Sequence, residues 1–384
     1  SGSAVVYVSA TAEDIPAVKL YADNYDGTST LPSATGTNSI SVGPFSTSTA
    51  VNTVSIGSSA DATADRAVSI GVNSSASGLR SISLGQSTAS GSDAIAIGTG
   101  SSSLAVESTA FGHDAVASLG RQAMALGDSY ASGTDSFAAA IANNTSSYGA
   151  SGANSVAMGY QAKATGQYAV AITGQAQATN FASIAAGFDA RASGSVSVAI
   201  GGSTTAIGQY SVALGNSVRA SARNSFASGF QARADIEGKY ARACKDFSSQ
   251  QGSAQYGHFV LLSDTTDATP EALTTNNSTA GTTNQIILPN NSAYAFHGTI
   301  VARQQASAGT ACAAWKIEGL IRREGSAGTT VLVNSATTVL DNTPSWGMAL
   351  SADTTNGGLK IEVTGAASTN IRFVATISTS EVSY

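Results

Sequence analysis

The stretch AVSIGVNSSASGLRSISLGQSTASGSDAIAIG, residues 67–98, repeats one short phrase three times. Each copy is an alternating run that ends in glycine, at Gly71, Gly85 and Gly98, and a run rich in Ser, Ala and Thr follows. Alternation with a period of two residues is typical of a β-strand, and glycine permits a sharp turn. The stretch therefore predicts short strands wound into a flattened solenoid.

The phrase recurs over about half of the chain, mostly in steps of 14 residues. A second glycine lies half a period earlier in many coils, as at Gly78 and Gly152, so each coil should hold two strands and two tight turns. Proline is absent between Pro44 and Pro270, which fits strands that donate every N–H. We predict about fourteen coils between residues 38 and 233, closed by Gly43, Gly57, Gly71, Gly85, Gly98, Gly112, Gly127, Ala142, Gly159, Thr173, Gly187, Gly201, Gly215 and Gly229.

The alternation also separates two faces of each strand. Val68 and Ile70 lie on one face, and Ala67 and Ser69 lie on the other. We expect the aliphatic pair to fill the lumen and the small face to let three chains pack side by side. Charged residues make up 11% and aromatic residues 7% of the chain, so burial has to come from stacked coils or from a core shared between chains. The sequence thus predicts a homotrimer.

The two ends of the chain depart from the repeat. Residues 1–37 contain two short strand-like runs around Pro16 and are predicted to dock the chain onto a larger assembly, with a simple cap for the first coil as the alternative. Residues 234–282 read as a neck with a short helical turn at TPEAL. Residues 283–384 predict an antiparallel sandwich or jelly roll with Trp315 in its core, from seven strand-like runs at 284–288, 293–304, 313–324, 329–340, 346–352, 358–365 and 371–378.

Two resemblances follow from these runs. NSVAMG (154–159), YSVALG (210–215) and DAIAIG (93–98) resemble the left-handed parallel β-roll of trimeric autotransporter adhesin heads. TTDATPEALTT (265–275), NQIILPNNSAYAFHGTIVARQ (284–304) and IRFVATISTSEVSY (371–384) resemble the C-terminal domain of bacteriophage tail fibre proteins. The second resemblance implies a tail or head fibre of a virion, made in the host cytoplasm and bound through its N-terminal segment to a tail or baseplate protein.

Composition and spacing exclude several kinds of site. The net charge of −6 argues against a nucleic-acid partner, which needs a basic surface. Cys244 and Cys312 show no metal or redox spacing and are expected to be buried thiols. His113, His258 and His297 share no ligand spacing, so we predict no metal and no cofactor. A trimer axis could still gather three copies of His258 or His297.

Catalytic residues are not expected either. Glycoside cleavage needs two carboxyl groups held several ångströms apart in a groove, one of them with a raised pKa. Asp93 and Glu107 lie one period apart, but just before an aliphatic run, where solvated turn residues are expected. The sequence predicts a protein that is not an enzyme.

Candidate contacts with a host receptor, either a surface glycan or an outer-membrane receptor, come from three places. Lys163, Arg191, Arg219 and Arg233 each lie four residues after a coil-closing position, and such a basic edge could hold an anionic glycan. The alternative for this edge is a solvated border that prevents pairing between sheet edges. Tyr148 lies in the longest step of the repeat and is expected on a projecting loop, whereas Asn342 and Trp346 flank a proline turn of the last domain.

Three functions remain open at this point. A phage fibre that attaches to a host predicts a trimer without turnover. A bacterial trimeric surface adhesin head predicts a longer parent protein with a membrane anchor. A polysaccharide-depolymerising tailspike predicts that reducing ends are released from a host glycan.

Overall fold

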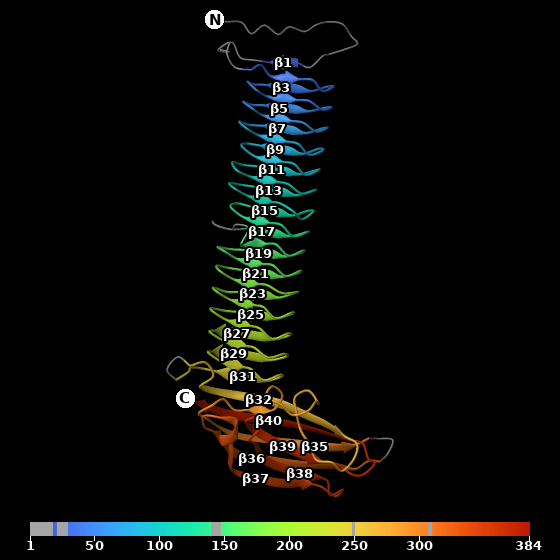
Figure 1. Ribbon diagram of the computed structural model, residues 1–384, viewed down its shortest axis with the longest axis vertical. Coiled ribbons are helices and arrows are strands. Elements are labelled where there is room, and N and C mark those ends of the chain that lie inside the picture. The colour runs from blue at the N-terminus through green and yellow to red at the C-terminus, as the bar shows by residue number, and fades with distance from the viewer. Residues whose placement is uncertain (1–17, 21–29, 140–146, 248–249, 306–308) are drawn as a thin grey trace. The chain divides into compact units, whose positions relative to one another are not determined.

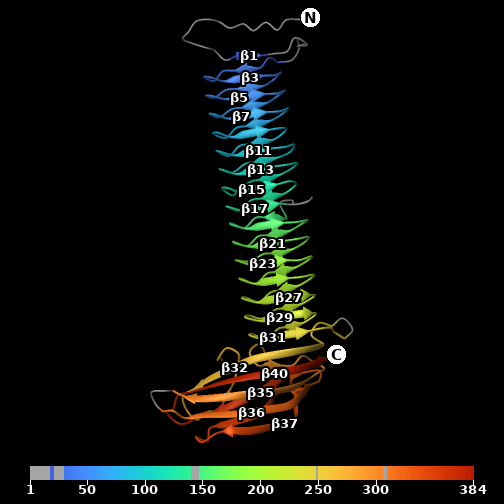
Figure 2. The same ribbon diagram turned by 180° about the vertical axis from the view of Figure 1, so that it is seen from behind.

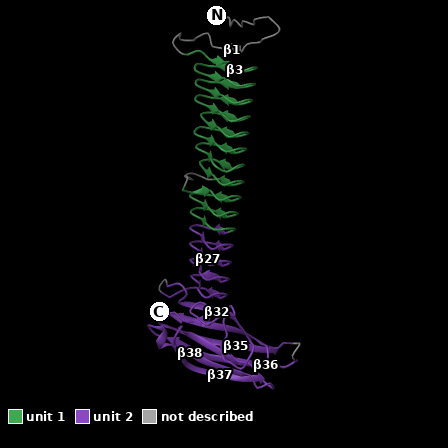
Figure 3. Cartoon of the chain, turned by 45° about the vertical axis from the view of Figure 1, so that its right-hand side comes forward, with its two compact units in different colours: residues 1–182 green, residues 183–384 purple. Residues whose placement is uncertain are grey.

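The computed structural model describes residues 18–20, 30–139, 147–247, 250–305 and 309–384 (Figure 1). These residues form strands, turns and one 3-10 turn at Ala327–Thr329, without an α-helix. Within the same ranges, no helix has the length and apolar character needed to span a membrane. The chain divides into two compact units, residues 1–182 and 183–384 (Figure 3). The predicted fold class is confirmed, because a parallel β-solenoid is followed by antiparallel sheets.

The first unit is built from coils that each contribute a three-residue and a two-residue strand. Each strand pairs in parallel with its equivalent in the next coil, so that Val68 lies opposite Ile82 and Ile70 opposite Leu84. The three-residue strands are β1 (Val18–Leu20), β3 (Ile40–Val42), β5 (Val54–Ile56), β7 (Val68–Ile70), β9 (Ile82–Leu84), β11 (Ile95–Ile97), β13 (Thr109–Phe111), β15 (Met124–Leu126), β17 (Phe137–Ala139), β19 (Val156–Met158) and β21 (Val170–Ile172). The two-residue strands are β2 (Ser33–Ala34), β4 (Thr47–Ser48), β6 (Asp61–Ala62), β8 (Ser75–Ala76), β10 (Thr88–Ala89), β12 (Ser102–Ser103), β14 (Val116–Ala117), β16 (Tyr130–Ala131), β18 (Gly149–Ala150), β20 (Lys163–Ala164) and β22 (Gln177–Ala178).

The coils begin inside the predicted docking segment. β1 pairs in parallel with β3, Val18 opposite Ile40, and β2 pairs with β4, Ser33 opposite Thr47. Both pairs extend the ladders of the later coils. The rest of the segment that we assigned to docking lies almost entirely outside the described residues.

The lumen of the coils holds the small side chains, which corrects our assignment of the faces. Ala67, Ser69 and Ala76 are fully buried, whereas Val68 is half-buried and Ile70 is exposed. Two strands of two or three residues, joined by tight turns, lie too close together to hold aliphatic side chains between them. Serine hydroxyls in the lumen bond to one another, as Ser69 Oγ does to Ser74 Oγ at 2.6 Å. The aliphatic side chains therefore point outward.

Two columns of glycine are required for different reasons. Gly71 has a φ of +135°, a conformation that L side chains rarely adopt, and a Cβ there would lie 2.5 Å from the carbonyl oxygen of Gly85. Gly78 has an ordinary φ, but a Cβ would lie 1.9 Å from the carbonyl oxygen of Gly91 in the next coil. Thr173 shows that the first kind of slot accepts another residue at a φ of +86°.

We expect Gly71→Ala to lower the free energy of unfolding by about 1–3 kcal/mol, the usual cost of holding a non-glycine residue in a rare backbone conformation. The added methyl group also presses on the backbone of the next coil. Urea titration followed by circular dichroism measures the loss. Gly325→Ala is the matched control, since no atom lies within 4 Å of a Cβ at that glycine. Equal stability of the two variants would contradict the argument.

The second unit starts with further coils. Its longer coil strands are β23 (Ile184–Ala186), β25 (Val198–Ile200), β27 (Val212–Asn216), β29 (Phe226–Phe230) and β31 (Tyr240–Ala243). Its two-residue strands are β24 (Arg191–Ala192), β26 (Thr205–Ala206), β28 (Arg219–Ala220) and β30 (Arg233–Ala234). All neighbouring coils pair in parallel, and β31 then pairs antiparallel with β32 (Ala254–Thr265), Tyr240 opposite His258.

The tip of the second unit consists of two antiparallel sheets packed on one core (Figure 2). The larger sheet has the strand order β32, β40 (Ile371–Ser383), β35 (Ser292–Gln304), β36 (Cys312–Arg323) and β37 (Val331–Asp341). In the smaller sheet, β33 (Glu271–Ala272), β34 (Ile286–Ile287) and β38 (Gly347–Asp353) all pair with β39 (Gly358–Thr364). Phe259, Ile317, Ile361 and Phe373 are buried between them, as is Trp315, whose predicted core position is confirmed.

Two expectations for the neck are wrong. The TPEAL segment forms strand β33 instead of a helical turn, because Glu271 pairs with Val363 and Ala272 with Glu362 of β39. The segment that we assigned to the neck also contains β32, which pairs with β40 along its full length and is therefore part of the tip sheet.

Candidate functional site

The outward face of the coil strands carries a stripe of apolar side chains. Ile56 and Ile70 stack in register with Leu84 in the first unit, and both isoleucines are 38% exposed. In the first unit this outward face carries further exposed apolar residues, namely Ile40, Phe111, Met124, Met158 and Ile172. In the second unit, the outward face of the coil strands carries Ile184 and Ile200. In each unit taken by itself, an exposed apolar surface of this kind marks an interaction surface. We call it the apolar stripe.

The apolar stripe becomes aromatic near the tip. Phe226 contacts Tyr240 with ring centroids 5.1 Å apart and ring planes tilted by 53°, and Tyr240 meets Tyr256 edge-on at 6.3 Å. Tyr256 lies parallel to His258 at 6.5 Å and is 41% exposed. Since Tyr240 pairs with His258 across β31 and β32, the stripe runs from the last coil onto the outer face of the tip sheet.

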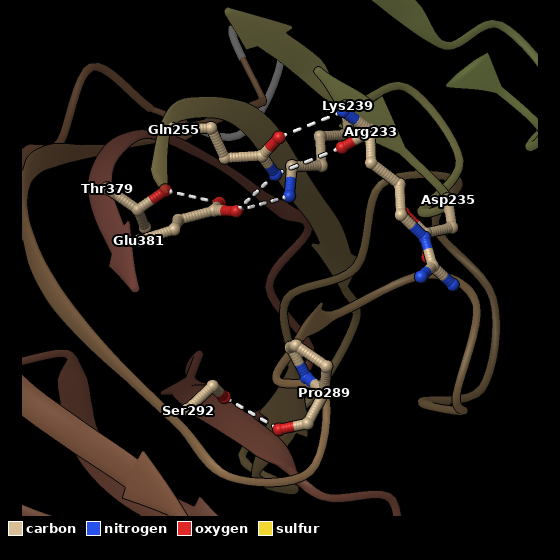
Figure 4. A network of polar contacts seen from close by, with 8 residues as sticks. All are labelled: Arg233, Asp235, Lys239, Gln255, Pro289, Ser292, Thr379 and Glu381. Atoms are coloured by element: carbon tan, nitrogen blue, oxygen red, sulfur yellow. Dashed lines mark hydrogen bonds and ion pairs between the residues drawn. The ribbon is translucent and has the colours of Figure 1, made fainter. Parts of the chain in front are cut away.

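A buried polar network joins the last coil to the tip sheet (Figure 4). The ammonium of Lys239, directly before β31, lies 2.7 Å from Glu381 Oε2 on β40, and the two side chains are 4% and 0% exposed. Gln255 Nε2 donates to the same oxygen at 2.6 Å, and Thr379 Oγ1 donates to Oε1 at 2.8 Å. The carboxylate is thus surrounded by donors, as a buried charge requires.

Gly257 makes room for this carboxylate. A Cβ at Gly257 would lie 2.1 Å from Glu381 Oε1 and 2.4 Å from Thr379 Oγ1. Sequence reasoning missed the network, because Lys239 and Glu381 are separated by 142 residues and only the folded chain brings them together.

A cavity of about 290 Å³ lies beside the network. The ion pair between Arg233 Nε and Asp235 Oδ2, 2.6 Å long, lies on its wall, and Tyr294 faces it from β35. Burial, helped by the charge of Glu381, raises the pKa of the Tyr294 hydroxyl well above its usual value. The cavity therefore offers a phenol that stays neutral at physiological pH, together with amide and guanidinium groups.

In the second unit, the predicted basic edge is one column of residues, and two of its arginines are paired with acids. Arg191, Thr205, Arg219 and Arg233 occupy one register through β24, β26, β28 and β30. Arg191 lies 3.0 Å from Asp189, and Arg233 is paired with Asp235. These acids offset much of the positive charge. Lys163 begins β20 in the first unit, at the equivalent place in its coil.

The three other candidate contacts differ in exposure. Trp346 is 5% exposed and packs edge-on against Phe373 at 6.2 Å, which corrects the expectation that its ring is available to a receptor. Asn342 bonds to the backbone of Trp346 twice, at 2.7 Å and 2.9 Å, so it stabilises the turn. Tyr148 is half-buried directly before β18, and residues 140–146 of its predicted loop lie outside the described residues.

The two acids that are spaced one period apart do not have the character of a general acid. Asp93 is held at 2.5 Å by Arg80, and Glu107 at 2.7 Å by Arg121. The hydrogen bond from the arginine lowers the pKa of each carboxyl group. A glycosidase acid needs a raised pKa instead, so neither group suits that role.

The cysteines and histidines form no cluster. Both Cys244 and Cys312 are exposed, which corrects our expectation of buried thiols. His258 and His297 lie on either side of Ser378 in neighbouring strands, and His113 lies beside Asp114. Within the described ranges, no group of three His, Cys, Asp or Glu side chains is placed to hold a metal ion.

Comparison with known families identifies the repeats. The coils match the YadA head domain repeat. The matched residues are 34–60, 62–88, 85–101, 89–115, 103–129, 150–172, 178–204, 192–217 and 206–232. All of them lie in the coils, so this part of the chain is similar to YadA head repeats, and the tip is outside the match. No curated protein sequence matches the chain.

Two solved structures are similar only in part. One is the tailspike gp49 of Acinetobacter baumannii bacteriophage Fri1, a capsular polysaccharide depolymerase, with a TM-score of 0.24 and 9% identity over 90% of this chain and 67% of that chain. The other is the tailspike of Acinetobacter baumannii phage AM24, with a TM-score of 0.18 and 8% identity over 91% of this chain and 65% of that chain. At such TM-scores neither similarity carries an argument about fold or function.

Proposed function

We propose that the chain is a homotrimeric adhesive fibre of a bacteriophage virion, which attaches the particle to a host cell surface. The observation that carries the proposal is the apolar stripe, because within each unit it repeats coil after coil and the described residues of the single chain leave it exposed. Three copies that place their stripes around one axis remove this surface from water. Alanine and serine fill each lumen, so the chain has no room to fold the aliphatic side chains inward.

Adhesion follows from the number of copies. A symmetric trimer presents each surface of the tip three times, and linked copies bind a repetitive surface far more strongly than one copy does. The YadA head repeats support an adhesive function for the coils. The phage origin rests on the resemblance of the C-terminal stretches to tail fibre domains, and a bacterial surface adhesin head is the other candidate because of the matched repeats.

The test has three measurements. Light scattering should give three times the mass of one chain, and labelled protein should bind host cells without releasing reducing ends from their glycans. Antibodies to the tip should label purified virions and leave the envelope of uninfected bacteria unlabelled. A single compact chain in solution or steady release of reducing ends would overturn the proposal, and labelling of the uninfected envelope would favour the bacterial adhesin.

A further inference from the structure

The far end of the larger tip sheet forms a polar cleft of about 350 Å³. It lies where β32 and β35 end and β40 begins, away from the residues of β32 that pair with β31. Neither the repeats nor the receptor contacts expected from the sequence include it. The residues that line the cleft are Asp264, Arg303, Gln304, Gln305, Asn370 and Arg372.

Two arginines lie side by side in this cleft. Arg372 on β40 is directly opposite Arg303 on β35, and Asp264 on β32 is opposite Arg372 on its other side. Like charges at directly opposed positions of an antiparallel pair destabilise a sheet. One carboxylate beside two guanidinium groups leaves a local excess of positive charge, on a chain whose net charge is −6.

Contacts within the protein occupy only a few of the hydrogen-bond donors of the two guanidinium groups. Arg303 Nη1 donates to the carbonyl oxygens of Thr310 and Ala311, the latter at 3.4 Å. Arg372 Nε lies 3.5 Å from Asp264 Oδ2, and its side chain is 82% exposed. A guanidinium carries five N–H donors in a rigid fork, so each arginine keeps donors for a ligand.

Two amides border the same cleft. Asn370 Nδ2 donates to Gln305 Oε1 at 2.9 Å, and the backbone N–H of Gln305 donates to the carbonyl oxygen of Asn370 at 2.9 Å. This double contact fixes the two loop ends. It leaves the side-chain oxygen Oδ1 of Asn370 as an acceptor and the side-chain amino group Nε2 of Gln305 as a donor, the pair that a sugar hydroxyl needs.

We propose that this cleft binds a carboxylate-bearing sugar of an acidic cell-surface glycan. Paired guanidinium forks match the planar carboxylate of a uronic or sialic acid, and the amides match its hydroxyls. The cleft has the size of a small-ligand pocket. Its lining holds no aromatic side chain among the described residues, so charge and hydrogen bonds select the ligand instead of ring stacking. The inference rests on the proposed adhesive function and names its receptor class.

The experiment titrates the full chain with a glucuronate-containing tetrasaccharide and with the same tetrasaccharide after reduction of its carboxyl groups, using calorimetry. We expect binding of the acidic form that weakens as salt is added, and binding of the reduced form that is weaker by about tenfold or more, the effect of losing one charge-assisted hydrogen bond. Arg372→Gln and Arg303→Gln should each give a similar loss. Arg372→Gln changes an exposed side chain, so it tests the site without risk to the fold.

Arg322→Gln is the matched control, since Arg322 lies on β36 of the same sheet, is paired with Glu324 and does not line the cleft. It should bind the acidic form as the unchanged chain does. Equal affinity for the acidic and reduced forms, no binding of the acidic form, or an equal loss in Arg322→Gln would overturn the inference. Stronger binding of a sulfated neutral tetrasaccharide would do the same, because it would assign the cleft to sulfate.

Cell attachment separates this inference from the proposed function. If the unchanged chain attaches to host cells and Arg372→Gln attaches equally well, the cleft is not the receptor site and the adhesive function stands. If the unchanged chain does not attach to any host cell although the tetrasaccharide binds, the adhesive function fails and the sugar site stands as a chemical finding.

Discussion

Replacing Ile56 and Ile70 by aspartate is expected to convert the trimer into single chains. The two residues are stacked in register on the apolar stripe, so a trimer would bury six added carboxylates around its axis. Burying an unpaired charge costs several kcal/mol, far more than the contact of one isoleucine contributes. In the single chain both side chains are exposed, so the coils should remain folded. Light scattering and circular dichroism measure mass and fold together.

The control adds the same two charges elsewhere. Asn52→Asp with Asn73→Asp changes two exposed turn residues, with φ values of +58° and +56° that aspartate also adopts readily. This variant should keep the mass of three chains. If the Ile56→Asp, Ile70→Asp variant keeps that mass as well, the apolar stripe is not the contact between copies.

The repeat could be predicted from the sequence because residues close together in the chain determine the turns and strands of each coil. Glycine at Gly71 and alternation in Val68–Ile70 each fix a turn or a strand without reference to distant residues. Which face points inward was not readable from alternation, because the pattern is the same from either side. The width of the coil decides it, and that width follows from how short the strands are. The sequence did contain one indication of the inward face, namely the alanines of the two-residue strands, such as Ala62 and Ala76.

Most strands of the tip could be predicted from the sequence, but the contacts between them could not. The runs from residue 293 to 378 correspond to β35 to β40, and in β35, β36, β39 and β40 buried residues alternate with more exposed ones. β32 was missed because it lies among turn residues and its partner, β40, comes more than 100 residues later. The opposition of Arg303 and Arg372 depends on the same kind of long-range register. Trp346 was misplaced because a proline turn suggests exposure, whereas Asn342 folds that turn onto the core.

Replacing Lys239 by methionine is expected to lower the free energy of unfolding of the tip by about 3–5 kcal/mol, because Glu381 would remain buried without its counter-charge. Trp315 and Trp346 both lie in the tip core, so tryptophan fluorescence during urea titration reports on this part of the chain. Lys316→Met removes an exposed partner of Glu318, 3.9 Å away, and should cost at most about 1 kcal/mol. A loss for Lys239→Met no larger than that of Lys316→Met would contradict the prediction.

A double variant separates the cost of an orphaned charge from the worth of the pair. Lys239→Met with Glu381→Leu removes both charges, and replacing a buried ion pair by apolar side chains is often neutral. We therefore expect it to recover most of the stability lost in the single variant. The pair would then serve mainly to specify how the last coil is joined to the tip sheet. β31 meets β32 through only three residue pairs, and Lys239, directly before β31, adds a contact to β40. If the double variant is less stable than the single one, the network itself stabilises the junction, and the last coil depends on it for its attachment to the tip.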